Sequence, residues 1–125
     1  MLAQAHHSLF VDTQGPGFLE LTRHLGDWLA VVGARDGLLT LFVRHTSASL
    51  TIQENADPDV LADLTEALRR LAPDQAGYRH AAEGRDDMPA HIKTMLTATS
   101  QQVPVIEGAM ALGTWQAVYL VEHRA

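Results

Sequence analysis

The chain has 125 residues, with 15 acidic and 9 basic side chains and a formal net charge of −6 when histidine is neutral. This length suits a single domain over residues 1–125 that buries its own core. The negative charge argues against nucleic acid or an anionic membrane as the main partner, although a small phosphorylated ligand needs only a few local donors. The chain has no cysteine, so disulfides are excluded and a metal ion would need His, Asp, Glu or water as ligands.

The N-terminal residues do not resemble a signal peptide, because no basic start is followed by an apolar run. No apolar stretch approaches the roughly 18 residues of a membrane span. We therefore expect a cytoplasmic protein with no membrane partner.

The first third of the chain predicts strands around one helix. Residues 6–11 and 18–21 predict two strands separated by a Gly-Pro-Gly turn. Apolar residues from 21 to 32 recur with helical spacing, and Gly33 suits the end of that helix. Residues 38–43 are mostly branched or aromatic, which predicts a buried strand.

Polar and apolar residues are interleaved between Arg44 and Asp63. Residues 48–53 alternate as a strand, and Asp57-Pro58 has the N-cap and first-turn chemistry of a helix start. Leucines at 61, 64, 68 and 71 form one stripe of that helix, which Pro73 ends. We expect this segment to line one wall of a polar cleft.

The second half predicts a long polar loop, a helix and two strands. Residues 72–89 are rich in helix breakers, and loops of this length are often functional. Pro89 is expected to start a helix with Ile92, Met95 and Leu96 on its core face. Residues 103–107 contain a proline, which predicts an edge strand. Residues 112–123 predict the last strand, with Trp115, Ala117, Tyr119 and Val121 on one face.

Three histidines lie at polar junctions: His45 at a strand end, His80 in the long loop and His91 in the first turn of a predicted helix. None belongs to a contiguous zinc motif, so a metal site would have to assemble by folding. Taken singly, such histidines are more often surface or hydrogen-bonded residues.

Two carboxylates, Glu54 and Glu122, each end an alternating strand among apolar neighbours. A buried carboxylate there needs an arginine, a histidine or a metal as partner. The sequence has no glycine-rich phosphate loop and no nucleophile elbow, so the common nucleotide and hydrolase signatures are absent.

Several segments in order resemble one family across essentially the whole chain. They are His45 to Val60, Tyr78-Arg79-His80, Asp86 to Lys93, and Val103-Pro104 followed by Leu112 to Gln116 and Glu122-His123-Arg124. Together they strongly resemble the YjbQ family, the so-called secondary thiamine-phosphate synthases.

The resemblance implies an α+β domain with a mixed, mainly antiparallel sheet and two to three helices, packed as a homotrimer with a polar pocket near a subunit boundary. It also implies the residues of the site. We expect catalytic roles for His45, Glu54 and His91, and metal binding by His80 and His91. We expect substrate contacts from Thr46, Ser47, Asn55, Arg79, Lys93, Gln116 and Glu122, with Asp57 also in the pocket.

The activity implied by the resemblance joins a pyrimidine diphosphate to a thiazole phosphate, giving thiamine phosphate and pyrophosphate. A divalent metal, Mg or Zn, would stabilise the departing charge, and no organic cofactor is expected. Two alternatives remain open: a metal-assisted hydrolase, and a non-catalytic binding module for a phosphorylated metabolite.

Overall fold

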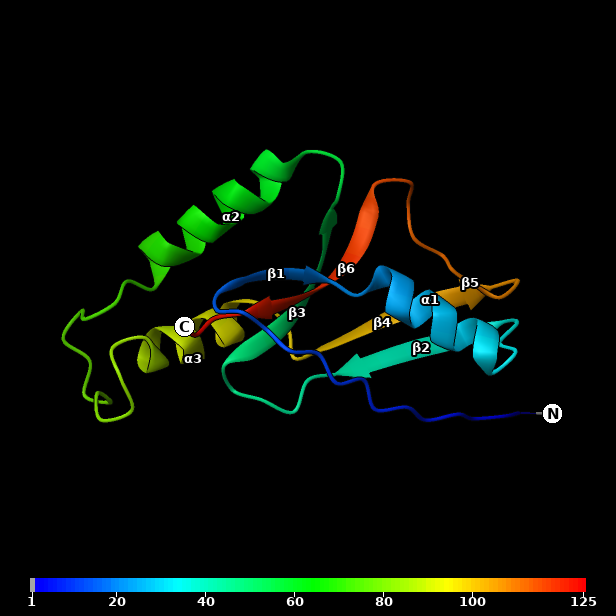
Figure 1. Cartoon of the computed structure of the whole chain (residues 1–125), viewed down its shortest axis with the longest axis horizontal. Coiled ribbons are helices and arrows are strands. Elements are labelled where there is room, and N and C mark those ends of the chain that lie inside the picture. The colour runs from blue at the N-terminus through cyan, green and yellow to red at the C-terminus, as the bar shows by residue number, and fades with distance from the viewer. Residues whose placement is uncertain (1) are drawn as a thin grey trace.

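The computed structural model describes residues 2–125, which fold into three helices and six strands (Figure 1). In chain order the elements are β1 (Gly17–Glu20), α1 (Thr22–Val31), β2 (Gly37–Phe42), β3 (Ala48–Glu54), α2 (Pro58–Leu71), α3 (Asp87–Leu96), β4 (Ser100–Ile106), β5 (Ala109–Met110) and β6 (Gln116–Glu122). The expected α+β class is confirmed. None of the described helices combines the length and hydrophobicity that crossing a lipid bilayer requires.

The strands form two three-stranded sheets, with the orders β1-β6-β3 and β2-β4-β5. All pairs of these described strands are antiparallel, where the resemblance implied a mixed, mainly antiparallel sheet. A backbone hydrogen bond from Leu50 N to Ala98 O, at 2.7 Å, links β3 to the segment just before β4. Val43 N donates to Thr99 O at 2.9 Å and so continues the β2–β4 ladder by one residue.

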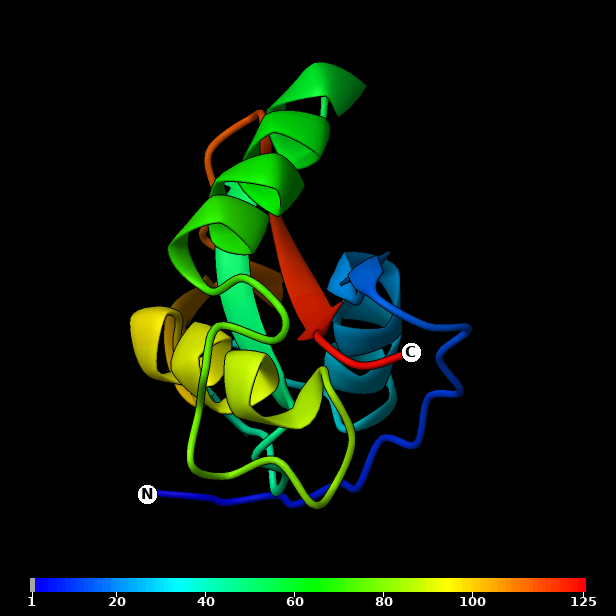
Figure 2. The ribbon, with the colours of Figure 1, turned by 90° about the vertical axis from the view of Figure 1, so that its left-hand side faces the viewer.

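The hydrophobic core lies where α1 packs against both sheets. Leu21 and the α1 residues Leu25 and Leu29 pack with Leu50 and Val118 of one sheet and with residues of β2 and β4. This matches the helical spacing in the sequence, and each buried leucine contributes roughly 1.5–3 kcal/mol of transfer free energy. Figure 2 shows β3 and β6 between α1 on one side and α3 on the other, so β6 buries residues on both faces.

Three strand predictions are wrong: one about the existence of a strand, one about burial and one about where a strand begins. Residues 6–11 form no strand. In β2 only Leu39 is buried, because α1 covers one face of the β2-β4-β5 sheet and leaves Leu38 and Phe42 exposed on the other. The last strand begins at Gln116 rather than at residue 112, and Trp115 is 62% exposed.

β4 is a central strand, where Pro104 predicted an edge. It pairs with β2 on one side and β5 on the other. The Pro104 carbonyl accepts a hydrogen bond from Ala111 N at 2.8 Å, so the missing N–H of Pro104 faces the same side, just beyond the two residues of β5. The proline is tolerated because the β4–β5 ladder ends there.

α2 begins as its capping signal predicts, whereas α3 begins earlier than predicted, and the apolar residues of both helices are less buried than expected. The Asp57 Oδ1 atom accepts a hydrogen bond from Asp59 N at 2.9 Å, yet α2 contains no buried residue. α3 begins at Asp87, two residues before Pro89, so His91 lies in its second turn. Met95 is 88% exposed, and the buried residues of α3 are Asp87, Pro89 and Ala90.

We expect Asp57→Ala to lower the free energy of unfolding of α2 by about 1 kcal/mol, because the helix loses its N-cap acceptor. Asp57→Asn keeps a side-chain oxygen at that position and serves as the control. Hydrogen exchange of α2 amides measures the local effect. Equal protection in the wild type and the alanine variant would contradict the capping role.

Candidate functional site

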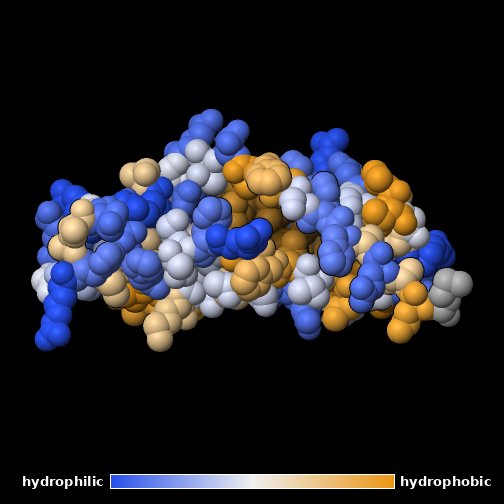
Figure 3. Space-filling view, turned by 90° about the horizontal axis from the view of Figure 1, so that it is seen from below, coloured by the Kyte–Doolittle hydropathy of each residue, from blue (hydrophilic) through white to orange (hydrophobic). Residues whose placement is uncertain are grey.

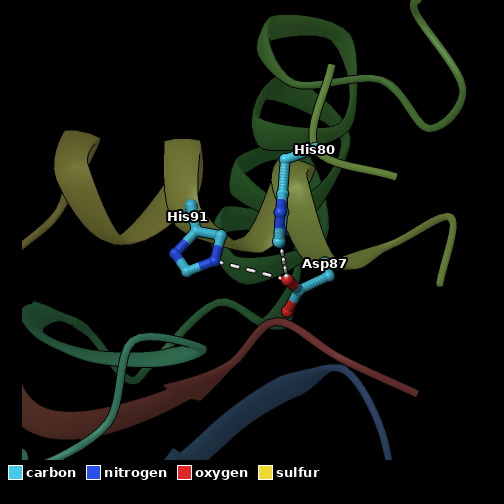
Figure 4. A group of neighbouring side chains, drawn as sticks. All are labelled: His80, Asp87 and His91. Atoms are coloured by element: carbon cyan, nitrogen blue, oxygen red, sulfur yellow. Dashed lines mark hydrogen bonds and ion pairs between the residues drawn. The ribbon is translucent and has the colours of Figure 1, made fainter. Parts of the chain in front are cut away.

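A cluster of two histidines and one aspartate forms where the 72–86 loop meets α3 (Figure 4). Asp87 and His91 are four residues apart on α3 and therefore share one helix face. His80 reaches them from the loop: its Nε2 donates to Asp87 Oδ2 at 2.6 Å, and His91 Nε2 lies 3.3 Å from the same oxygen. The two imidazole rings meet edge to face, with centroids 5.5 Å apart.

The Asp87 carboxylate is held from both ends. Its Oδ2 faces the two histidines, and its Oδ1 lies 3.1 Å from Nη1 of Arg124. The hydrogen bond from His80, together with the charges of Arg124 and His91, lowers the pKa of Asp87 even though burial opposes ionisation. Asp87 is therefore ionised at neutral pH and presents one oxygen to the histidines.

Arg124 ties the end of β6 to the loop before α3. Its Nε and Nη2 donate to Asp86 Oδ1 at 3.2 and 3.1 Å, and Nη2 also donates to the Glu83 carbonyl at 2.7 Å. The N–H of Ala125 and the Arg124 guanidinium lower the pKa of Asp86. Gly84 is required beside this contact, because its φ is +108° and an added Cβ would lie 3.1 Å from Arg124 Nη2.

A second histidine, His123, is buried where β3 and the end of β6 meet the C-terminal end of α3. His123 Nε2 and Ser49 Oγ share a hydrogen bond of 2.9 Å, and Thr97 Oγ1 donates to Ser49 Oγ at 2.6 Å. Burial, assisted by the charge of Lys93, lowers the pKa of His123 to about 4. His123 is thus neutral at physiological pH and links β6, β3 and the end of α3.

The structure brings together part of the predicted site. His80 and His91 lie side by side, as expected for metal ligands. Thr46 borders α3, since its carbonyl accepts a hydrogen bond from Thr94 at 3.4 Å, and the Ser47 carbonyl accepts one from His123 N. Two further predicted residues, Lys93 and Glu122, line a small cavity together with His123 and residues of β1 and α2.

The remaining predicted residues lie elsewhere. Glu54, Asn55 and Gln116 sit at the opposite end of the β3–β6 ladder, roughly 20 Å away given the rise of a strand. There Glu54 Oε2 accepts a hydrogen bond from Asp57 N at 3.3 Å, and Gln116 Oε1 accepts one from Gly113 N. His45 and Arg79 are exposed. Within one chain, Glu54 and His91 therefore do not belong to the same site. The 44–63 segment contributes residues to two separate regions instead of lining one wall of a single cleft.

The sequence patterns did not predict Asp87 as a site residue or Arg124 as its partner. The i, i+4 spacing of Asp87 and His91 was visible, but the predicted helix began at Pro89 and left Asp87 in the loop. A helix start placed two residues earlier would have put both side chains on one face. No local signal links Arg124 to Asp87, because the contact spans most of the second half of the chain.

The fold and the cluster define an α+β protein of two antiparallel sheets with a two-histidine, one-aspartate site at a loop–helix junction. Residues 7–125 match the family model described as UPF0047 protein YjbQ-like. The chain belongs to the YjbQ family.

Individual relatives agree with this assignment. A UPF0047 protein from Synechocystis sp. is 50% identical over 97% of this chain and 83% of its own length, and the UPF0047 protein YjbQ of Salmonella typhimurium is 46% identical over 86% and 79%. Among solved structures, an uncharacterised conserved protein of the family from Clostridium acetobutylicum has a TM-score of 0.84 at 36% identity, covering 95% of this chain and 89% of its own. A conserved hypothetical protein from Thermus thermophilus has a TM-score of 0.83 at 38% identity, with 94% and 89% covered.

We expect the free energy of unfolding to fall as pH is lowered from about 6.5 to about 4, by up to about 3 kcal/mol from His123 alone. In this window the unfolded imidazole binds a proton and the buried one does not, so the stabilisation is complete above pH 6.5 and is lost on acidification. Urea unfolding at several pH values measures it.

The control is His123→Gln, which retains hydrogen-bonding groups but does not titrate. Its stability should change less over the same pH range. If the wild type and this variant lose stability in parallel between pH 6.5 and 4.5, His123 does not hold a depressed pKa.

Proposed function

We propose that this chain is a metal-dependent enzyme acting on a phosphorylated small molecule, with the ion held by His80, Asp87 and His91. The observation that carries the proposal is that one donor atom from each residue lies within 4.8 Å of the other two. Three protein ligands leave coordination positions for water or substrate, as catalytic sites do. The side chains of His80 and His91 are 44% and 37% exposed, so a substrate can reach them.

The donor set favours zinc over magnesium. Two imidazole nitrogens and one carboxylate oxygen suit Zn²⁺, whereas Mg²⁺ prefers oxygen ligands and retains several waters. The short His80–Asp87 hydrogen bond places a proton between two prospective ligand atoms. A bound ion would replace this hydrogen bond. Because an imidazole nitrogen binds a metal only without its proton, affinity should rise with pH.

For the reaction we propose the one that the family resemblance implies. The bond between the pyrimidine methylene carbon and the diphosphate oxygen breaks, the diphosphate leaves with the electron pair, and the thiazole nitrogen forms the new C–N bond. The bound ion would supply positive charge for the departing diphosphate. Arg124 contacts the Asp87 carboxylate at 3.1 Å and holds it beside the two histidines. We assign proton transfer or a phosphate contact to His45, which adjoins Thr46 beside α3.

The exposure of the cluster supports hydrolysis as a second candidate. Water reaches the half-exposed His80 and His91 as readily as a second substrate does. A metal site with three protein ligands would then activate water for attack on a phosphorylated substrate. The third alternative, a binding module without turnover, uses the same residues and differs only in leaving its ligand unchanged.

We also propose that the chain forms the homotrimer that the resemblance implies. Within one chain Glu54 lies at the far end of the β3–β6 ladder from the cluster, so a neighbouring subunit would have to supply it. The outer face of the β2-β4-β5 sheet exposes Leu38, Phe42 and Ile106. Seen from below, hydrophobic residues gather over the middle and right of the molecule, while the left end is mostly hydrophilic (Figure 3). Such a surface favours burial against another copy.

To test the metal site, we expect the zinc-loaded wild type to retain about one equivalent of zinc per chain after dialysis, and His91→Ala to bind it at least about tenfold more weakly. His24→Ala on the exposed face of α1 is the matched control and should bind zinc as the wild type does. Metal analysis gives the zinc content. Equal zinc retention by all three proteins would contradict the assigned ligands.

The same proteins separate the candidate reactions when they are supplied with the pyrimidine diphosphate and the thiazole phosphate. Thiamine phosphate formed by the wild type and lost in His91→Ala supports the transferase. Release of inorganic phosphate without a joined product supports the hydrolase. Recovery of both compounds unchanged by zinc-loaded protein contradicts both enzymatic reactions and favours the binding module.

We expect sedimentation to give a particle of about three times the 13.6 kDa chain mass. Phe42→Asp places a charge on the exposed apolar sheet face and should lower the trimer fraction. Met95→Asp on α3 is the comparison at a residue that is even more exposed, and it should leave the trimer fraction unchanged. A wild type that sediments as a single chain at micromolar concentration would contradict the trimer.

A further inference from the structure

The loop between α2 and α3 forms an open pocket beside the His80–Asp87–His91 cluster. Its volume is about 490 Å³, within the roughly 300–1,000 Å³ of small-molecule sites. The lining residues are Gln75, Gly77, Tyr78, His80, Ala81, Gly84 and Arg85. Because His80 belongs both to this lining and to the cluster, a molecule in the pocket lies next to the metal ligands.

The charge of the pocket is opposite to that of the chain. The whole chain carries −6, yet none of the lining residues is acidic, and Arg85 brings a permanent positive charge to the lining. Arg85 Nη2 donates to the neutral Gln75 Oε1 at 2.9 Å. Across residues 2–125, no carboxylate forms an ion pair with Arg85, whereas Arg69 and Arg70 each pair with Glu66, and Arg124 pairs with two aspartates. The Arg85 charge is therefore available to a ligand.

The loop backbone shapes this pocket. The Tyr78 hydroxyl donates to the Pro73 carbonyl at 2.8 Å, which fixes the ring in the lining. Gly77 has φ +75°, and an added Cβ there would meet nothing within 4 Å, so this position faces open space. Gln75 adopts φ +53°, a conformation that is unfavourable for a residue with a side chain, and its amide oxygen holds Arg85.

We propose that this loop pocket binds the phosphate group of the substrate, with Arg85 as the recognition residue and His80 joining the pocket to the reacting centre. The planar guanidinium donates paired N–H groups that match phosphate oxygens, and Arg85 has donors to spare beyond its bond to Gln75. The assignment rests on the proposed function for the position of the metal, but the phosphate contact itself does not need the ion. Arg79, which the sequence suggested as a substrate ligand, is not in the lining.

The test measures binding of inorganic phosphate to the full chain by calorimetry, with metal-free protein and with zinc-loaded protein freed of excess zinc. We expect Arg85→Gln to weaken phosphate binding at least about tenfold, because a charge-assisted bidentate contact is lost. Arg85→Lys retains the charge but not the fork and should give an intermediate loss. Arg79→Gln removes a nearby charge outside the pocket and should change the affinity less than about twofold.

Phosphate affinity that is the same in Arg85→Gln and the wild type overturns the proposal, as does an equal loss in Arg85→Gln and Arg79→Gln. Circular dichroism checks that the variants are folded. We expect them to fold, because Arg85 is exposed and its substitution leaves the core unchanged. Zinc content separates the two proposals. Phosphate binding through Arg85 in a chain that retains no zinc contradicts the proposed function alone, and zinc retention without phosphate binding contradicts the pocket alone.

Discussion

The antiparallel pairing of β3 with β6 is the interaction on which the candidate site depends. Its register aligns Ala48 with Glu122 at one end and Glu54 with Gln116 at the other. Just past the first end, His123 N donates to the Ser47 carbonyl, and Arg124 continues to the loop before α3. A one-residue slip would turn the side chains to the opposite face of the sheet and remove Arg124 from Asp87. The register of β3 and β6 thus determines whether Arg124 reaches the Asp87 carboxylate on α3.

Electrostatics in this acidic chain are local. Arg124 contacts Asp86 and Asp87 at the cluster, where partial burial limits screening by solvent. On the exposed face of α2, Arg69 lowers the pKa of Glu66 to about 2, but a solvated pair of this kind contributes little to stability. Arg85 differs from both because its nearest polar partner is a neutral amide. The net charge of −6 therefore does not exclude a phosphate ligand.

Residue spacing predicted the elements well where one short segment carries the whole signal. The Asp57-Pro58 start of α2 and the leucine spacing of α1 are both confirmed. Burial was predicted less well, because it depends on what lies opposite each face. β2 looked like a buried strand, but Leu38 and Phe42 on one of its faces are exposed. Met95 and Leu96 of α3 are exposed as well. Pro104 suggested an edge strand because the sequence does not reveal that β5 has only two residues.

The family and the α+β class followed from local patterns and motifs, which reside in contiguous residues. His80 and His91 were recognised as candidate ligands for the same reason, since each lies in a distinctive polar segment. The residues that contact these histidines could be identified only in the folded chain. Asp87 contacts them because α3 begins at that residue, and Arg124 reaches Asp87 from just beyond the end of β6. Folding also moved Glu54 away from the cluster. Such long-range proximity arises from sheet register and helix packing, and neither is encoded within a window of a few residues.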